Sequence, residues 1–279
     1  ELRHGGELTI QKPRSFRRTL SCWLDGASPP SLELTPEGAV VFQHSDLQLA
    51  LRPDRGDDYI FGEVFCDDVY QLDSVAQPLD TVIDLGANIG LFSLRVAQQA
   101  NRVVAVESCP DNYQLACRNL VLNGLEERVE LVHAAACGSS ERNVRLHLSD
   151  NAGGHSLHPH LAARWPHPGE TVVQSVSLAE LFERHQIESC SLLKCDIEGS
   201  EYAVIDKAPL SILKRVDRFL IEAHPQCGDR PWRGLHTICG KLRTYSMPLR
   251  LELQGSHNVT PESCQTHPIA QRITLLAAA

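Results

Sequence analysis

Two glycines frame a short segment whose residue types could bind a charged ligand. Gly86 and Gly90 follow the apolar run TVIDL and enclose Ala87 and Asn88, while Asp84 lies just before them. Glycines after a strand allow a tight turn, and they let a ligand approach the backbone N–H groups at the start of a helix. The segment therefore predicts a ligand-binding turn that carries an acid.

Spacing and charge indicate which ligand this turn takes. A dinucleotide loop has the pattern Gly-x-Gly-x-x-Gly, whereas Asn88 stands here in place of the central glycine. The Asp84 carboxylate would repel a pyrophosphate and attract an ammonium group. The next predicted strand ends at Glu107, where a carboxylate can accept hydrogen bonds from both hydroxyls of a ribose. A cationic amino acid joined to an adenosine, as in S-adenosylmethionine, satisfies both demands.

An alternation of strands and helices must position these residues. The predicted central strands after residue 80 are 81–86, 102–108, 129–135, 191–199 and 218–225, with two further strands at 143–148 and 171–178 that flank a long loop. The predicted helices are 89–99, 111–124, 177–186 and 233–245. This alternation implies a parallel sheet with right-handed crossovers. Segments 249–253 and 273–277 are expected to close it as an antiparallel pair, and Ser177 is expected to cap its helix. The predicted fold class is α/β, a mostly parallel Rossmann-like sheet.

The sequence divides into two predicted parts. Residues 1–75 read as a small strand-rich cap or lead-in segment, because short apolar pieces with period-two alternation are separated by turns. Residues 76–279 form the predicted α/β domain. Its loop 151–169 is long for a compact domain, so it is either functional or mobile. We expect the cap and this loop to cover a pocket for the second substrate.

Composition limits the classes of partner. The formal charge of -9 disfavours binding to nucleic acid, and no apolar run approaches the length of a membrane span. Ten cysteines without a Cys-x-x-Cys pair are typical of reduced thiols in a cytoplasmic protein. We therefore expect a small-molecule partner and leave a homo-oligomer open. The absence of an initiator Met suggests that the first residues are a trimmed boundary.

Several motifs together resemble one known family. DLGANIG, VES, LNG, GGHSL and LLKCDIEGSE occur in this order between Asp57 and Glu222. They are similar to the motifs of the FkbM-like methyltransferases. The resemblance implies a class I methyltransferase fold and S-adenosylmethionine as methyl donor. It also implies O-methylation of a hydroxyl on a sugar, a polyketide or another natural product.

The resemblance also assigns candidate cofactor residues. The glycine loop would hold the methionine moiety, Glu107 the ribose, and Ala135 the adenine edge, while Asp196 matches the acid that closes the cofactor pocket. Ser108 and Asn112 follow Glu107 and complete the set. The full candidate set is Asp84, Gly86, Ala87, Asn88, Gly90, Glu107, Ser108, Asn112, Ala135 and Asp196. The sequence departs from the family pattern at Cys195 and at His155.

An alcohol acceptor needs a base to remove its proton. The candidates are His224 and Glu222 at the end of the fifth strand, Asp196, and His155 in the long loop; histidine has a suitable resting pKa. For Asp196, Glu198 and Glu201 the alternative is that acids stabilise a helix N-terminus. The loop histidines match no structural zinc pattern, so we predict no metal site, although a divalent ion near Asp196 stays conceivable.

Three other functions remain open at this point. A nicotinamide-dependent oxidoreductase would use the same sheet, but Asp84 and the missing central glycine argue against it. A binding module without activity could retain the fold. A methyltransferase acting on RNA or protein is the third alternative, disfavoured for RNA by the acidic charge.

Overall fold

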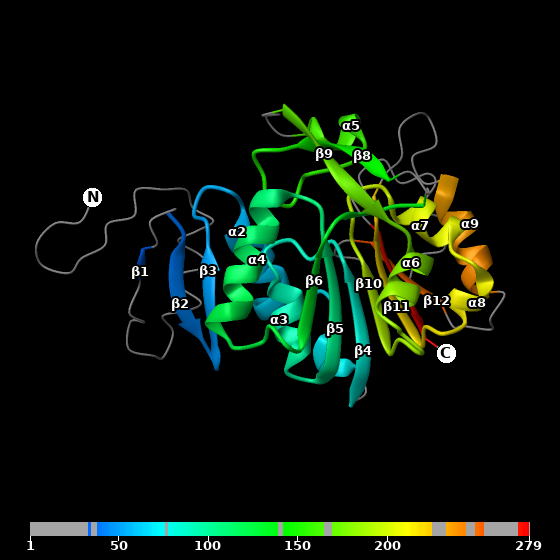
Figure 1. Ribbon diagram of the computed structural model, residues 1–279. Coiled ribbons are helices and arrows are strands. Elements are labelled where there is room, and N and C mark those ends of the chain that lie inside the picture. The colour runs from blue at the N-terminus through cyan, green and yellow to red at the C-terminus, as the bar shows by residue number, and fades with distance from the viewer. Residues whose placement is uncertain are drawn as a thin grey trace, which may run out of the picture.

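The computed structural model describes residues 33–34, 38–75, 78–138, 142–164, 169–224, 233–243, 249–253 and 273–278. A seven-stranded sheet with the order β12-β13-β11-β10-β4-β5-β6 lies at its centre (Figure 1). Its parallel strands are β4 (Leu79–Leu85), β5 (Ala100–Glu107), β6 (Val129–His133), β10 (Leu192–Cys195) and β11 (Arg218–Ala223). Two antiparallel strands, β13 (Ile273–Ala278) and β12 (Leu249–Leu253), close the sheet beside β11, as predicted.

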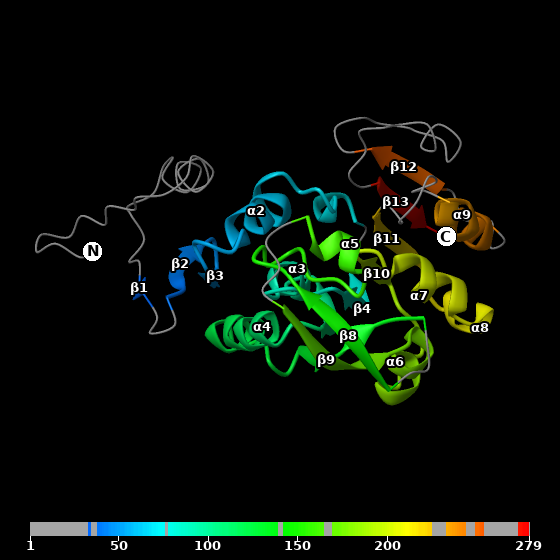
Figure 2. The same ribbon diagram turned by 90° about the horizontal axis from the view of Figure 1, so that it is seen from above.

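Helices cover both faces of this sheet (Figure 2). They are α3 (Leu91–Ala97) and α4 (Pro110–Leu122) on one face, and α6 (Leu178–Arg184), α7 (Glu201–Lys207), α8 (Leu210–Leu213) and α9 (Arg233–Arg243) on the other. Successive strand residues point to opposite faces, so Val82 and Val103 pack with α3 and α4, whereas Ile83 and Val104 pack with α6 to α9. The continuous apolar runs of the sequence therefore belong to strands buried on both sides, and the predicted α/β class is confirmed.

The N-terminal cap contains the predicted strands and three helical segments that the sequence reasoning missed. Strands β1 (Glu33–Leu34), β2 (Val40–His44) and β3 (Leu47–Leu51) form an antiparallel sheet, followed by α2 (Asp57–Phe61), the π-helical turn η1 (Gly62–Cys66) and the 3-10 turn η2 (Leu72–Ser74). Phe42 and Phe61 belong to the same buried cluster as Leu94 and Val103. The described cap residues therefore share one core with the α/β segment, and the boundary near residue 75 stays a prediction.

Two asparagines of α4 hold the cap against the α/β segment. Asn119 accepts from the N–H of Ala50 at 2.7 Å and donates to its carbonyl oxygen at 3.2 Å. One turn later, Asn123 does the same for Gln48, at 2.8 and 2.7 Å. Side-chain amides can replace a neighbouring strand in this way because each offers a donor and an acceptor. The outer edge of β3 is thus hydrogen-bonded to a helix.

A third sheet lies above the carboxyl edge of the central one (Figure 1). It has the order β7-β9-β8, formed by Ala135–Ala136, Gly169–Val176 and Asn143–Leu148. The predicted single strand over 129–135 is therefore wrong at its end, because β6 stops at His133 and β7 pairs with β9 instead. The long loop contains the short helix α5 (Pro159–Ala162), and its residues 165–168, including His167, lie outside the described residues.

Within the described ranges, no helix is both long and apolar enough to cross a membrane.

Candidate functional site

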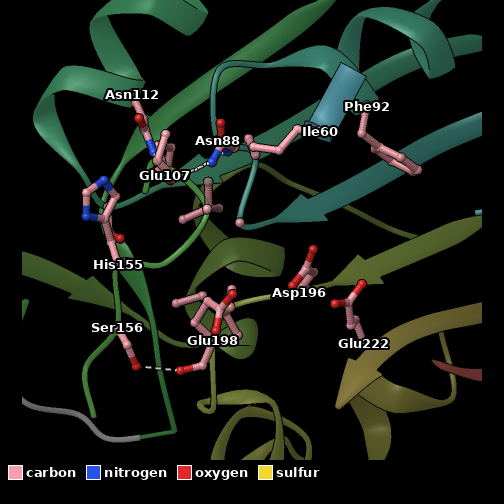
Figure 3. A pocket seen from close by; sticks show the side chains of 18 of the residues that line it. Ile60, Asn88, Phe92, Glu107, Asn112, His155, Ser156, Asp196, Glu198 and Glu222 are labelled. Atoms are coloured by element: carbon pink, nitrogen blue, oxygen red, sulfur yellow. Dashed lines mark hydrogen bonds between the residues drawn. The ribbon is translucent and has the colours of Figure 1, made fainter. Parts of the chain in front are cut away.

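A cavity of about 430 Å³ opens at the carboxyl ends of β4, β5, β10 and β11 (Figure 3). Parallel sheets place ligands at this edge. The structure brings most of the predicted site residues together there; those that line the cavity are Gly86, Ala87, Asn88, Glu107, Ser108, Asn112, Ala135, His155, Asp196, Glu222 and His224. Asp84 and Gly90 do not line it.

Glu107 is the buried carboxylate at one end of the cavity. Its Oε2 accepts the N–H of Asn88 at 2.8 Å, and its Oε1 accepts the N–H of Cys109 at 2.7 Å. Burial raises the pKa of Glu107, while these two N–H groups and the Lys194 ammonium oppose that shift. The bonds fix the plane of the carboxylate, and each oxygen keeps a second lone pair that can accept from a hydroxyl in the cavity.

The residue that precedes the GGHSL motif ties the long loop to the glycine loop through its carbonyl group. The Ala152 oxygen accepts from the side-chain amides of Asn88 at 2.8 Å and Asn112 at 2.9 Å. Arg52 donates to Asn112 Oδ1 at 2.7 Å and forms an ion pair with the buried Asp57 at 2.9 Å. Three segments that lie far apart in the sequence therefore meet at the cavity wall. Asn112 acts through this bond network as well as by lining the cavity.

Lys194 was missed by the sequence reasoning, although it lines the cavity. Its ammonium nitrogen lies 3.2 Å from Asp84 Oδ1 and 3.8 Å from Asp196 Oδ2, and it donates to the Gly86 carbonyl at 2.7 Å. Burial lowers the pKa of Lys194, but Asp84 and Asp196 outweigh burial and raise it overall. The one sequence signal was a charged residue inside the apolar run SLLKC.

Asp84 lies behind the cavity wall. It is fully buried, it accepts from the Ser93 hydroxyl at 2.7 Å, and it faces the ammonium group of Lys194. We predicted that Asp84 would attract an ammonium group of the ligand, and the ammonium beside it in the structure belongs to the protein. Gly90 caps α3 in a left-handed conformation, φ 84°, against Ala116. Asp84 and Gly90 therefore support the glycine loop from the side that faces away from the cavity.

Glu201 fits the alternative of an acid at a helix N-terminus. Its carboxylate accepts the N–H groups of Ile197 at 3.1 Å and Gly199 at 3.0 Å, at the start of α7. The same Oε1 lies 2.9 Å from Nδ1 of His224. Glu201 is therefore fully engaged with protein groups.

His224 is surrounded by carboxylates. Besides Glu201 at Nδ1, its Nε2 lies 3.4 Å from Glu198 Oε2 and 3.6 Å from Glu222 Oε1. Burial lowers the pKa of His224, but Glu198, Glu201 and Glu222 raise it well above the usual value. A ring with carboxylates at both nitrogens is an imidazolium and holds no free lone pair. The predicted role of His224 as a general base is therefore not supported by its surroundings.

We expect His224 to remain charged at neutral pH, which NMR can test. Because its folded-state pKa is raised, its contribution to stability is complete below the unfolded value of about 6.5 and is lost only as pH rises through the folded-state pKa. Its two ring nitrogens, assigned by comparison with His224→Gln, should both keep the nitrogen chemical shifts of a protonated imidazolium between about pH 6 and pH 8, also where Glu198 titrates. A His224 titration near 6.5 would contradict the imidazolium assignment.

Glu198 has the features of a strained functional residue. Its backbone φ is 49°, in the left-handed region that non-glycine residues rarely adopt. It lines the cavity, and its Oε2 is buried without a hydrogen-bond partner among the described residues. Burial raises its pKa to about 7, with His224 opposing that shift. A carboxylate with this pKa can take up a proton near neutral pH.

Three of these side chains lie close enough to be considered for a metal ion. One atom each of Asp196, Glu201 and His224 lies within 4.8 Å of the others. However, Glu201 already accepts two backbone N–H groups and faces the charged His224 ring. Metal binding would require His224 to lose its proton and Glu201 to lose these bonds. The donor set is better explained as an internal ion-pair cluster, and we assign no metal to it.

The cavity fits a cationic nucleoside-amino acid. Glu107 offers oriented carboxylate oxygens to a ribose at one end, and Figure 3 shows Asp196, Glu198 and Glu222 at the other. Acids at that far end favour an ammonium or sulfonium group. The residues present therefore suit S-adenosylmethionine.

Comparison with known proteins agrees with this fit. The family model described as the methyltransferase FkbM domain matches residues 84–246, more than half of the 279-residue chain. The methyltransferase sdnD of Sordaria araneosa is 26% identical over 204 residues, which are 62% of this chain and 77% of that protein. The hexuronic acid methyltransferase AglP of Haloferax volcanii is 26% identical over 154 residues, 53% of this chain and 58% of that protein.

Two further matches are more limited. A stretch of 53 residues, 18% of this chain, is 51% identical to the AMB antimetabolite synthetase AmbE of Pseudomonas aeruginosa, of which it covers only 2%. Among solved structures, M. jannaschii TYW2 in complex with AdoMet aligns with 12% identity and a TM-score of 0.47, over 86% of this chain and 84% of that one. The family match together with the site geometry leads to one conclusion. The chain belongs to the FkbM methyltransferase family, and its methyl donor is S-adenosylmethionine.

Proposed function

We propose that the protein methylates a hydroxyl group of a small molecule, a sugar, a polyketide or another natural product. The observation that carries this proposal is the continuity of one cavity from Glu107 to Glu198, Glu222 and His224. The Glu107 end suits the nucleoside, so the carboxylate end is left for the methionine part and for the group that receives the methyl. The name of the relative AglP, a hexuronic acid methyltransferase, supports a sugar acceptor.

The bound S-adenosylmethionine supplies a methyl group that its positively charged sulfur makes electrophilic. The protein must then place the acceptor oxygen in line with that methyl group, and positioning of this kind supplies much of a rate enhancement. The aromatic rings of Tyr70 and Phe92 line the cavity beside Lys194 and form an apolar wall for the acceptor. The centroids of these two rings lie 5.2 Å apart in an edge-to-face arrangement.

A carboxylate of the cavity must accept the proton of the hydroxyl. Glu198 is the best placed, because Oε2 has no hydrogen-bond partner among the described residues and its pKa of about 7 suits proton uptake. Glu222 and Asp196 remain candidates, and His224 would hold the carboxylates in place as a cation. His155 does not fit a base, because burial lowers its pKa to about 4 and its Nδ1 accepts the Ser149 N–H.

Labelled methyl transfer tests the proposal. The purified protein would be incubated with S-adenosylmethionine carrying a labelled methyl group and a panel of uronic acids, neutral sugars and hydroxylated polyketides. Each acceptor would be paired with its deoxy analogue, which lacks one hydroxyl. Transfer to a hydroxyl that is absent when that hydroxyl is removed supports the proposal. Transfer only to amines, to RNA or to protein would overturn it.

Glu107→Ala should abolish cofactor binding. The variant removes the predicted ribose acceptor and also leaves the N–H groups of Asn88 and Cys109 without an acceptor, at about 1–3 kcal/mol of unfolding free energy each. Calorimetric titration with S-adenosylhomocysteine, alongside urea unfolding, separates the two effects. Glu127→Ala, at an exposed position, should match the wild type in both measurements. Wild-type affinity in a folded Glu107→Ala protein would refute the ribose assignment.

A further inference from the structure

His155 occupies the nucleoside end of the cavity. It is 9% exposed and lines the cavity wall. Figure 3 shows it at the same end as Glu107 and Asn112, away from Glu222. Its position in the loop is fixed by the bonds that hold Ala152, whose N–H also donates to the Arg55 carbonyl at 2.7 Å.

The hydrogen bond at one ring nitrogen determines the tautomer of His155. The backbone N–H of Ser149 donates to Nδ1 at 3.0 Å, so Nδ1 carries no proton. The ring is neutral near pH 7, because burial and then the neighbouring Arg55 and Arg52 lower its pKa to about 4. In a neutral imidazole whose Nδ1 accepts, the proton must sit on Nε2. His155 therefore presents Nε2–H as a fixed donor.

This donor lacks an acceptor among the described residues. Nε2 is buried and makes no hydrogen bond there. Buried N–H groups are almost always paired in folded proteins, and an exception calls for a water or a ligand. Rotating the ring would break the hydrogen bond between Nδ1 and the Ser149 N–H, so the protein cannot give Nε2–H an acceptor without losing that bond. The missing acceptor must come from whatever fills this end of the cavity.

The nucleoside of the cofactor can supply that acceptor. Glu107 is an acceptor-only group that suits the ribose hydroxyls, which are donors to it. The adenine base carries ring nitrogens with free lone pairs, and these are acceptors of the kind that Nε2–H needs. We propose that His155 donates a hydrogen bond from Nε2 to a ring nitrogen of the adenine and thereby helps to select adenosine at this site. The inference depends on the cofactor and not on the identity of the methyl acceptor.

The test compares S-adenosylhomocysteine with three analogues in which N1, N3 or N7 of the adenine is replaced by a C–H group. Dissociation constants would be measured by calorimetry with the full-length protein. One analogue should bind the wild type about tenfold more weakly, the effect of losing one buried hydrogen bond. If all three analogues bind as tightly as the parent compound, or if the parent compound does not bind, the proposal fails.

Two substitutions at residue 155 assign the effect to this side chain. His155→Asn keeps an acceptor for the Ser149 N–H but lacks a donor at the Nε2 position, whereas His155→Gln restores a donor there. In His155→Asn the parent compound and the weak analogue should bind with equal affinity, and His155→Gln should recover part of the difference. A tenfold difference that persists in His155→Asn would show that another group donates, and would overturn the proposal.

A matched control lies in the same loop. His160 is exposed and does not line the cavity, so His160→Asn should keep the wild-type affinities for all four compounds. Circular dichroism and thermal melting would establish that each variant is folded. Should His155→Asn fail to fold, the comparison of analogues on the wild type still decides whether an adenine ring nitrogen is recognised. In that case a reduced difference in His155→Gln supports residue 155 as the donor, and an undiminished tenfold difference overturns that assignment.

Discussion

Gly86→Ala is expected to lower the unfolding free energy by about 2–5 kcal/mol and to abolish cofactor binding. A β-carbon at this position would lie 1.8 Å from the carbonyl oxygen of Asp196 and 2.9 Å from its carbonyl carbon. These are backbone atoms at the end of the neighbouring strand β10, so no change of rotamer relieves the clash. The φ of 84° adds about 1–2 kcal/mol for a residue with a side chain, and overpacking adds about 1–3 kcal/mol.

Gly124→Ala separates the two contributions. Gly124 also has a positive φ, 62°, but a β-carbon there would meet nothing within 4 Å. This control should lose only the conformational part, about 1–2 kcal/mol, and should bind S-adenosylhomocysteine normally. Urea unfolding and calorimetric titration of both variants provide the comparison. Equal losses in the two variants would show that the contact between the glycine loop and Asp196 is not as close as described.

Lys194→Met is expected to cost about 3–5 kcal/mol, because it leaves the fully buried Asp84 without its counter-ion. The ammonium group also lies 5.7 Å from the Tyr70 ring centre and 5.6 Å from that of Phe92, and both contacts would be lost. Since Lys194 donates to the Gly86 carbonyl, the glycine loop should loosen and cofactor affinity should fall as well. Chemical unfolding and calorimetric titration measure the two effects.

A double-mutant cycle with Asp84→Asn identifies the source of the loss. Removing both charges should restore a substantial part of the stability, because the isolated buried carboxylate is the main penalty. Lys207→Met is the matched control: its side chain is 68% exposed and lies 3.7 Å from Asp206, so the change should cost at most about 1 kcal/mol. Additive losses in the double variant would mean that the Lys194–Asp84 pair is not the origin of the effect.

Local patterns predicted the elements that carry the site. Ser177 was identified as a helix cap, and its side chain forms a capping box with Glu180 at the start of α6. The antiparallel closing pair was found from two short apolar runs. These features depend on residues that are only a few positions apart, so a single sequence is enough to predict them.

The predictions of secondary structure were wrong where a strand or loop pairs with residues that lie far away in the sequence. The run VELVHAA shows no break in its sequence pattern at His133, yet the chain changes sheets after that residue because Ser175 and Val176 supply the partners for Ala135 and Ala136. Helix α8 was missed, and helix α7 was foreseen only as the alternative interpretation of the acids at its N-terminus, because the acidic motif was interpreted mainly as chemistry. Edge pairing is a long-range choice that local propensity does not encode.

The sequence by itself determined the family, the order of strands and helices, and the residues that would gather at one edge of the sheet. Motif order and hydrophobic period are properties of the chain, and parallel topology brings strand ends together. The tertiary structure decided which charged groups form ion pairs, namely Asp84 with Lys194 and Glu201 with His224. It also decided that the Ala152 carbonyl accepts hydrogen bonds from the side chains of Asn88 and Asn112. Electrostatic and hydrogen-bond partners depend on distances of a few ångströms and on burial, and only the folded chain sets these between residues far apart in sequence.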